Sequence, residues 1–61
     1  MKLHEFLANV LEKQVCRVTY HDGKQLVDLR GSAEELRLNK EVMNRKITTA
    51  YVGSNILIIL L

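Results

Sequence analysis

The chain has 61 residues, a formal net charge of +2, one cysteine and no proline. Its 48% hydrophobic and 26% charged residues are typical of one globular domain spanning residues 1–61, and they exclude a disordered chain. A single thiol excludes an intrachain disulfide framework, and so small a charge does not indicate a nucleic-acid-binding protein. A domain this short buries only about 60% of the surface that its unfolded chain exposes, so we expect a well-packed monomer or an oligomer.

The first predicted element is an amphipathic helix. Apolar residues recur at i, i+3, i+4, i+7 and i+8, namely Leu3, Phe6, Leu7, Val10 and Leu11. Three turns of helix are marginal in water by themselves. We therefore expect this apolar stripe to pack against the rest of the domain.

A β-hairpin is predicted next. Residues 15–20 alternate, with Cys16, Val18 and Tyr20 on one face. The following pair, Asp22-Gly23, is the pair favoured in a two-residue type I′ turn. A thiol on the apolar face of a strand behaves as a small hydrophobe, so we expect Cys16 to be buried and unreactive.

The assumed turn also sets the register of the hairpin. On the polar face it places Arg17 opposite Asp28, which pairs opposite charges. On the apolar face it pairs Val18 with Val27 and Cys16 with Leu29.

A short helix is expected after the second strand of the hairpin. Ser32 and Glu35 have the spacing of a capping box, which favours a helix that starts after Ser32 and extends to about Asn39. The extent of this helix between Ser32 and Asn44 stays open at the level of sequence.

Two further strands end the chain, over residues 47–52 and from residue 55 or 56 to residue 61, with a turn at 53–55. The last strand is apolar on both faces, which is typical of a central strand in a covered sheet or of a subunit interface. One helix of three turns covers only one face of the sheet, so we predict that this segment is an oligomer interface. The candidate interface residues are Ile56, Leu57, Ile58, Ile59, Leu60 and Leu61.

The predicted elements add up to an α+β domain of order α-β-β-α-β-β. In this arrangement the N-terminal helix packs on a small, mainly antiparallel four-stranded sheet. The simplest closed assembly is a two-fold homodimer that buries the uncovered face or pairs an edge strand.

No residue set indicates catalysis, a metal site or a cofactor. Ser32 is explained as a helix cap, and neither His4 nor His21 has the spacing of a metal motif. The glycines are dispersed, so there is no phosphate-binding loop. We expect a protein that is not an enzyme, although an active site between subunits stays open as an alternative.

A loose basic segment is the candidate ligand or partner surface. Its members are Arg37, Lys40, Arg45, Lys46 and Tyr51. Basic residues beside an exposed aromatic residue are typical of single-stranded nucleic-acid binding, which makes a small basic nucleic-acid-binding module the alternative function. A solvated charged face explains the same residues, because acidic residues interleave with them.

The order of features resembles a group of known proteins. The matching positions are Leu3, Phe6 and Leu7, then Asp22-Gly23, then Glu34, Glu35 and Leu36, then residues 43–47 and residues 57–61. In these positions the chain resembles short uncharacterised proteins encoded by phages and mobile elements of Gram-positive bacteria. The resemblance implies a viral or mobile-element origin and no established activity.

Two short segments, residues 6–9 and 52–56, are similar to the Sm and Hfq pattern. That similarity implies RNA binding by a ring of subunits. The chain departs from the pattern at Val52, where Sm proteins usually have arginine, and at Asp28, near where a glycine lets the strand bend.

These observations lead to a functional hypothesis. We expect a non-enzymatic phage or mobile-element accessory protein that forms a homo-oligomer and binds a host protein or sequesters a small ligand, for example in counter-defence. The longest apolar run has six residues, Ile56–Leu61, whereas a membrane helix needs about 20. With a free thiol and no signal peptide, the expected location is the cytoplasm, that of the host cell if the protein is viral.

Overall fold

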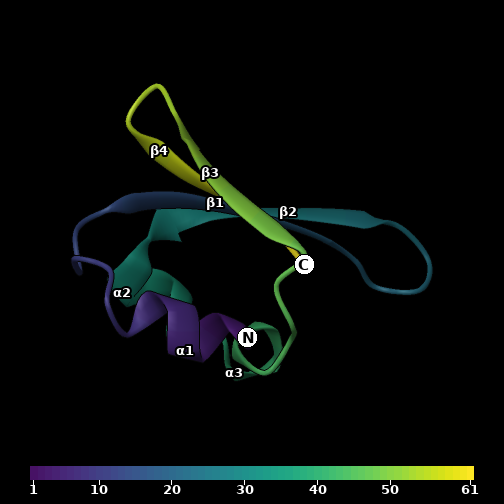
Figure 1. The fold of residues 1–61 in the computed structure, drawn as a ribbon. Helices are drawn as coiled ribbons and strands as arrows, with labels where there is room; N and C mark the ends of the chain where they lie inside the picture. Colours follow the sequence, from purple (N-terminus) through teal and green to yellow (C-terminus); the bar gives the residue numbers. More distant parts are fainter.

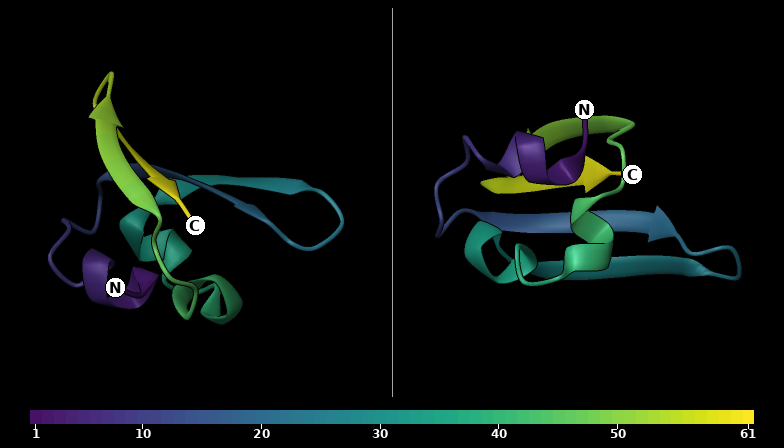
Figure 2. Two further views of the ribbon diagram at one scale, coloured as in Figure 1. Left: turned by 45° about the vertical axis from the view of Figure 1, so that its right-hand side comes forward. Right: turned by 90° about the horizontal axis from the view of Figure 1, so that it is seen from below.

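A computed structural model describes residues 1–61. Three short helices lie on one face of a four-stranded sheet, and no element covers the other face (Figures 1 and 2). The helices are α1 (Leu3–Leu7), α2 (Ala33–Leu36) and α3 (Lys40–Met43). The strands are β1 (Val15–His21), β2 (Leu26–Ser32), β3 (Thr49–Gly53) and β4 (Ile56–Leu60). The predicted α+β class is confirmed, and the order of elements differs only in having two helices in the middle.

The strand order is β2-β1-β4-β3. The two hairpins, β1–β2 and β3–β4, are antiparallel, and they join through parallel pairing of β1 with β4. The sheet is therefore mixed, with two antiparallel pairs and one parallel pair. β4 is a central strand, which agrees with its apolar composition, and β2 and β3 are the two edges.

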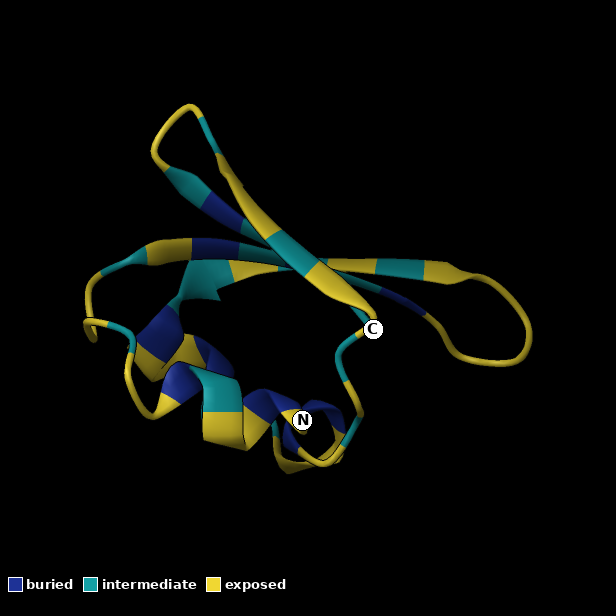
Figure 3. Ribbon diagram, viewed as in Figure 1, coloured by how far each residue is buried: buried dark blue, intermediate teal, exposed yellow.

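The core lies between the sheet and the helices (Figure 3). The sheet contributes alternate residues of its two central strands, and the helices contribute their inward apolar positions. No polar or charged residue is buried. The buried residues are Leu3, Leu7, Cys16, Val18, Tyr20, Ala33, Leu36, Val42, Met43, Leu57 and Ile59.

The first helix is shorter than its apolar stripe predicted. α1 ends at Leu7, Val10 is only half-buried, and Leu11 is 81% exposed. The chain leaves the helix because tertiary contacts compete for its end. The carbonyl oxygen of Glu12 accepts a hydrogen bond from the N–H of Glu34 in α2. The guanidinium of Arg37 donates to the carbonyl oxygens of Leu7 and Val10.

The register of the β1–β2 hairpin differs by two residues from the predicted one. The connecting loop has four residues, Asp22–Gln25, and the pair His21 and Leu26 flanks it. Because side chains alternate with a period of two, the shift leaves each residue on its predicted face and changes only its partner. Across the inner face, Cys16 pairs with Gly31 and not Leu29, and Val18 pairs with Leu29 and not Val27.

The type I′ turn predicted at Asp22-Gly23 is wrong. Gly23 has a positive φ of 99°, but Asp22 does not, and type I′ requires both. The Asp22 carboxylate instead accepts hydrogen bonds from the N–H groups of Lys24 and Gln25, each at 2.8 Å. This side-chain turn stabilises the longer loop.

The second hairpin holds the two-residue turn with positive φ at both central positions. Ser54 and Asn55 have φ of 53° and 65°, and they connect the paired residues Gly53 and Ile56. The turn predicted at 53–55 is thus confirmed and has the type I′ pattern of φ.

The middle of the chain forms two helices. Ser32 and Glu35 make the predicted capping box at the start of α2: the Ser32 Oγ accepts from the Glu35 N–H at 3.2 Å, and the Glu35 carboxylate accepts from the Ser32 N–H at 3.1 Å. α2 ends at Leu36, before the predicted end near Asn39. The Asn39 side chain instead accepts a hydrogen bond from the Val42 N–H and begins a separate helix, α3. None of the three helices is long and apolar enough to cross a membrane.

Candidate binding surface

The sheet face opposite the helices is the largest feature without a covering layer. We call it the open face and define it by the β4 side chains Ile56, Ile58 and Leu60 together with Arg17 of β1 and Tyr51 of β3. The register places Ile58 between Arg17 and Tyr51. The three β4 side chains are half-buried, although the helices lie on the other face of the sheet (Figure 1).

An ion pair lies beside this apolar stripe. The Arg17 guanidinium donates to the Asp28 carboxylate from Nε at 3.0 Å and from Nη2 at 2.8 Å. The hydrogen bonds that Arg17 donates lower the pKa of the Asp28 carboxyl group, and the same contact raises the pKa of the Arg17 guanidinium. The predicted pairing of these charges is confirmed, but as a diagonal contact, because the residue directly opposite Arg17 is Arg30.

The predicted oligomer interface is divided between the two faces of the sheet. Leu57 and Ile59 are buried under the helices, and Leu61 is half-buried against the same core. Ile56, Ile58 and Leu60 face the other way, on the open face. These three residues are therefore the part of the predicted interface that a partner can reach.

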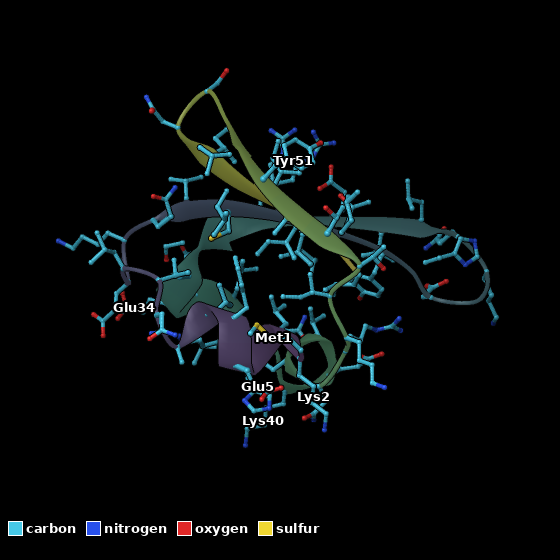
Figure 4. All side chains as sticks on the ribbon, in the orientation of Figure 1. Met1, Lys2, Glu5, Glu34, Lys40 and Tyr51 are labelled. Atoms are coloured by element: carbon cyan, nitrogen blue, oxygen red, sulfur yellow. The ribbon has the colours of Figure 1, made fainter.

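The predicted ligand surface is not continuous. Figure 4 shows Tyr51 on the open face and Lys40 on the helical side of the molecule. The guanidinium of Arg37 is held by the end of α1, as described above. The guanidinium of Arg45 lies 4.4 Å from the centre of the Tyr20 ring and donates to the His21 carbonyl oxygen at 3.3 Å.

Arg37 and Arg45 thus have partners within the fold. Lys40 is exposed on the helical side, and Lys46 is exposed in the loop before β3. Tyr51 and Lys40 lie on opposite sides of the molecule (Figure 4). The five residues consequently do not form the joint basic and aromatic surface that the alternative function needs.

The chemically reactive residues are placed as follows. Cys16 is fully buried, as predicted; burial raises the pKa of its thiol, which donates a weak hydrogen bond to the Gln14 carbonyl oxygen at 3.4 Å. Ser32 is the helix cap that the sequence predicted. His21 Nδ1 accepts from the Gly23 N–H at 3.1 Å. No pocket is found in the chain, and no group of three His, Cys, Asp or Glu residues is arranged to hold a metal ion.

Pairing through an edge strand is an expectation from the sequence that names no strand, and in the fold β3 is an exposed edge. Tyr51 is 53% exposed and Val52 is 69% exposed at this edge. The sequence does not identify this edge, because alternation along a strand does not show which distant strand lies beside it.

Comparison with protein-family models, with curated protein sequences and with solved structures gave no significant match.

Proposed function

We propose that the protein is a non-enzymatic binding protein that assembles with copies of itself and uses the open face to do so. The observation that carries this proposal is the position of the helices. All three pack on the face that holds Leu57 and Ile59, and the apolar side chains of the other face keep no cover within the chain.

The energetic argument is that uncovered apolar side chains favour association. Each side chain of this size contributes about 1.5–3 kcal/mol when it is fully buried. Ile56, Ile58 and Leu60 are already half-buried by their neighbours, so each gains a fraction of that amount in a complex. The Arg17–Asp28 ion pair at the border of the stripe gives the surface the polar rim that protein interfaces commonly have.

The cellular role that we propose is that of a phage or mobile-element accessory protein in the host cytoplasm, where the assembled form binds a host protein or sequesters a small ligand. The support for this role is the resemblance of the positions named above, between Leu3 and Leu61, to short proteins of such elements. A ligand site in this proposal lies between chains.

Sedimentation and light scattering at high micromolar concentration test the assembly. Ile58→Lys places a charge in the centre of the stripe, and we expect it to give folded, soluble monomers. Ile59→Lys places the same charge in the core, and we expect it to unfold the chain. The matched control is Leu38→Lys, because Leu38 is 83% exposed and lies away from the sheet; this variant is expected to assemble like the wild type.

The same variants test partner binding. Wild-type protein and Leu38→Lys, used as bait in a host lysate, are expected to retain the same protein or small molecule in native mass spectrometry, and Ile58→Lys is expected to lose it. A wild-type protein that stays monomeric at high micromolar concentration would contradict the proposed assembly.

A further inference from the structure

β3 is an edge strand whose outer side has unpaired backbone N–H and C=O groups. We propose that a second copy of the chain pairs with this edge, β3 against β3, in an antiparallel arrangement with the two-fold axis at Tyr51. This inference rests on the proposed self-association and adds an edge contact to it, because edge pairing places the open faces of two copies side by side and leaves them free to associate.

The two edges of the sheet differ in how well they are protected. β2 carries the charged residues Asp28 and Arg30, and α2 packs against its end, with the Glu35 side chain next to Gly31. Charges and a covering helix are the usual devices that prevent edge pairing. β3 has neither device: its sequence from Thr49 to Gly53 is uncharged and lacks proline.

The β3–β4 turn determines which backbone groups of β3 are free. In a hairpin with a two-residue loop, the pair that flanks the loop is hydrogen-bonded, and bonded pairs then alternate along the ladder. Gly53 and Ile56 are that pair, so the main-chain groups of Ala50 and Val52 point to the open edge. A strand that bonds to Ala50 and Val52 is therefore the expected occupant.

A second β3 fits these groups in one antiparallel register. Ala50 of one copy lies opposite Val52 of the other, and Tyr51 lies opposite Tyr51. The small Ala50 side chain leaves room for the larger Val52, which is 69% exposed in the single chain. The two Tyr51 rings form a cross-strand aromatic pair, and such pairs stabilise sheets. Because β3 carries no charged residue, the β3 edges of two copies can pair without repulsion between like charges.

The pairing also explains how the open face acquires the size of an interface. A two-fold axis between antiparallel strands is perpendicular to the sheet, so the open faces of both copies lie on one side. Ile58 lies next to Tyr51 in the register, and the two apolar stripes then join across the Tyr51 pair. The resulting eight-stranded sheet presents one continuous platform. The hairpin tip projects away from the helices, which leaves space for the second copy (Figures 1 and 2).

A charge-exchange experiment tests the register, because a residue on a two-fold axis meets itself. Tyr51→Lys and Tyr51→Glu each place like charges opposite one another, and we expect each to weaken the dimer at least about tenfold in sedimentation equilibrium. An equimolar mixture of the two is expected to form mixed dimers. Tyr51→Phe is the control that keeps the ring and dimerises like the wild type.

Disulfide trapping checks the same axis independently. Opposite residues of a non-hydrogen-bonded pair have Cα atoms about 4.5 Å apart, within the range of a disulfide. Tyr51→Cys is expected to cross-link on oxidation at least about tenfold faster than Thr49→Cys, which lies opposite Gly53 of the second copy. Wild-type protein is the blank, since Cys16 is buried.

The outcomes separate the two proposals. If the wild type is dimeric, Ile58→Lys dissociates it and the Tyr51→Lys and Tyr51→Glu variants form no mixed dimers, the edge pairing is wrong and assembly through the open face stands. Equal cross-linking of Tyr51→Cys and Thr49→Cys also overturns the register. A wild-type monomer overturns both proposals.

Discussion

Gly23 is the glycine of the chain that has a positive φ, 99°. A Cβ atom built there meets no atom within 4 Å, so only the backbone conformation limits the residue. We expect Gly23→Ala to lower the free energy of unfolding by about 1 kcal/mol, because an L-residue is strained at this φ. Gly23→Val is expected to lower it further. In a domain of this size about 1 kcal/mol corresponds to a fall in Tm of about 4–8 °C, which thermal unfolding followed by circular dichroism measures.

Gly53 provides the matched control. Its φ is not positive, and a Cβ atom there would lie 3.5 Å from the Ile58 Cδ1, an ordinary van der Waals contact. We expect Gly53→Ala to be neutral or to raise Tm slightly, since alanine restricts the unfolded chain. Equal losses of Tm for Gly23→Ala and Gly53→Ala would show that the φ at Gly23 has no energetic role.

The arginines show why the candidate ligand surface was not predictable from sequence. Arg37 and Arg45 are close together in the chain and equally basic, and both were assigned to a partner surface. In the fold, Arg37 binds the carbonyl oxygens at the end of α1, and Arg45 stacks on Tyr20. A guanidinium near a free carbonyl or an aromatic ring finds an internal partner, and the sequence does not show which residues tertiary structure will bring near.

At the scale of elements, local patterns predicted the faces of strands better than their partners. Asp22-Gly23 and residues 53–55 were both recognised as turns, and alternation gave the inward residues Cys16, Val18 and Tyr20 correctly. The register of the β1–β2 hairpin depends on whether the Asp22 carboxylate accepts hydrogen bonds from N–H groups of its own loop, and it does so from Lys24 and Gln25. A few hydrogen bonds therefore determine the length of the loop, and the pattern of apolar residues does not show them.

Ser54 and Asn55 allow a test of the second hairpin. Serine at positive φ is strained, whereas asparagine and glycine tolerate it, and Asn-Gly is the preferred type I′ pair. The double variant Ser54→Asn with Asn55→Gly is therefore expected to raise the free energy of unfolding by about 1 kcal/mol. Thermal unfolding measures the change as a higher Tm.

Ser54→Val is the opposite control, because a β-branched residue is poorly tolerated in this region, and it is expected to lower Tm. If both changes at the turn leave Tm unaltered, the φ angles of the β3–β4 hairpin are not those described above.

For the whole molecule, the sequence indicated a covered and an uncovered face but not the arrangement that produces them. The apolar pattern of residues 56–61 is typical of a central strand or of a subunit interface, and in the fold β4 is central. Its parallel pairing with β1 joins strands separated by most of the chain. A period of two along each strand carries no information on which distant strand lies beside it, so the mixed topology and the bare β3 edge emerged only from the fold.

Acid should destabilise the whole domain, because several carboxylates are hydrogen-bonded in the native state. The Arg17 guanidinium lowers the pKa of Asp28, and the Ser32 N–H and hydroxyl lower the pKa of Glu35. The N–H groups of Gln25 and Lys24 do the same for Asp22. All three side chains are exposed, so each contribution is small and screened by salt.

The sign of the effect follows from proton binding. A carboxylate whose pKa is lower in the folded than in the unfolded chain binds fewer protons when folded. Its contribution to stability is fully present above the unfolded values, 3.8 for Asp28 and 4.5 for Glu35, and is lost as pH falls through the folded pKa. We expect Tm to fall progressively below about pH 4.5. Asp28→Asn removes one of these carboxylates, so it should make the fall of Tm in acid shallower and should lower Tm near neutral pH. A Tm that rises on acidification below pH 3.8 would contradict the native hydrogen bonds of these groups.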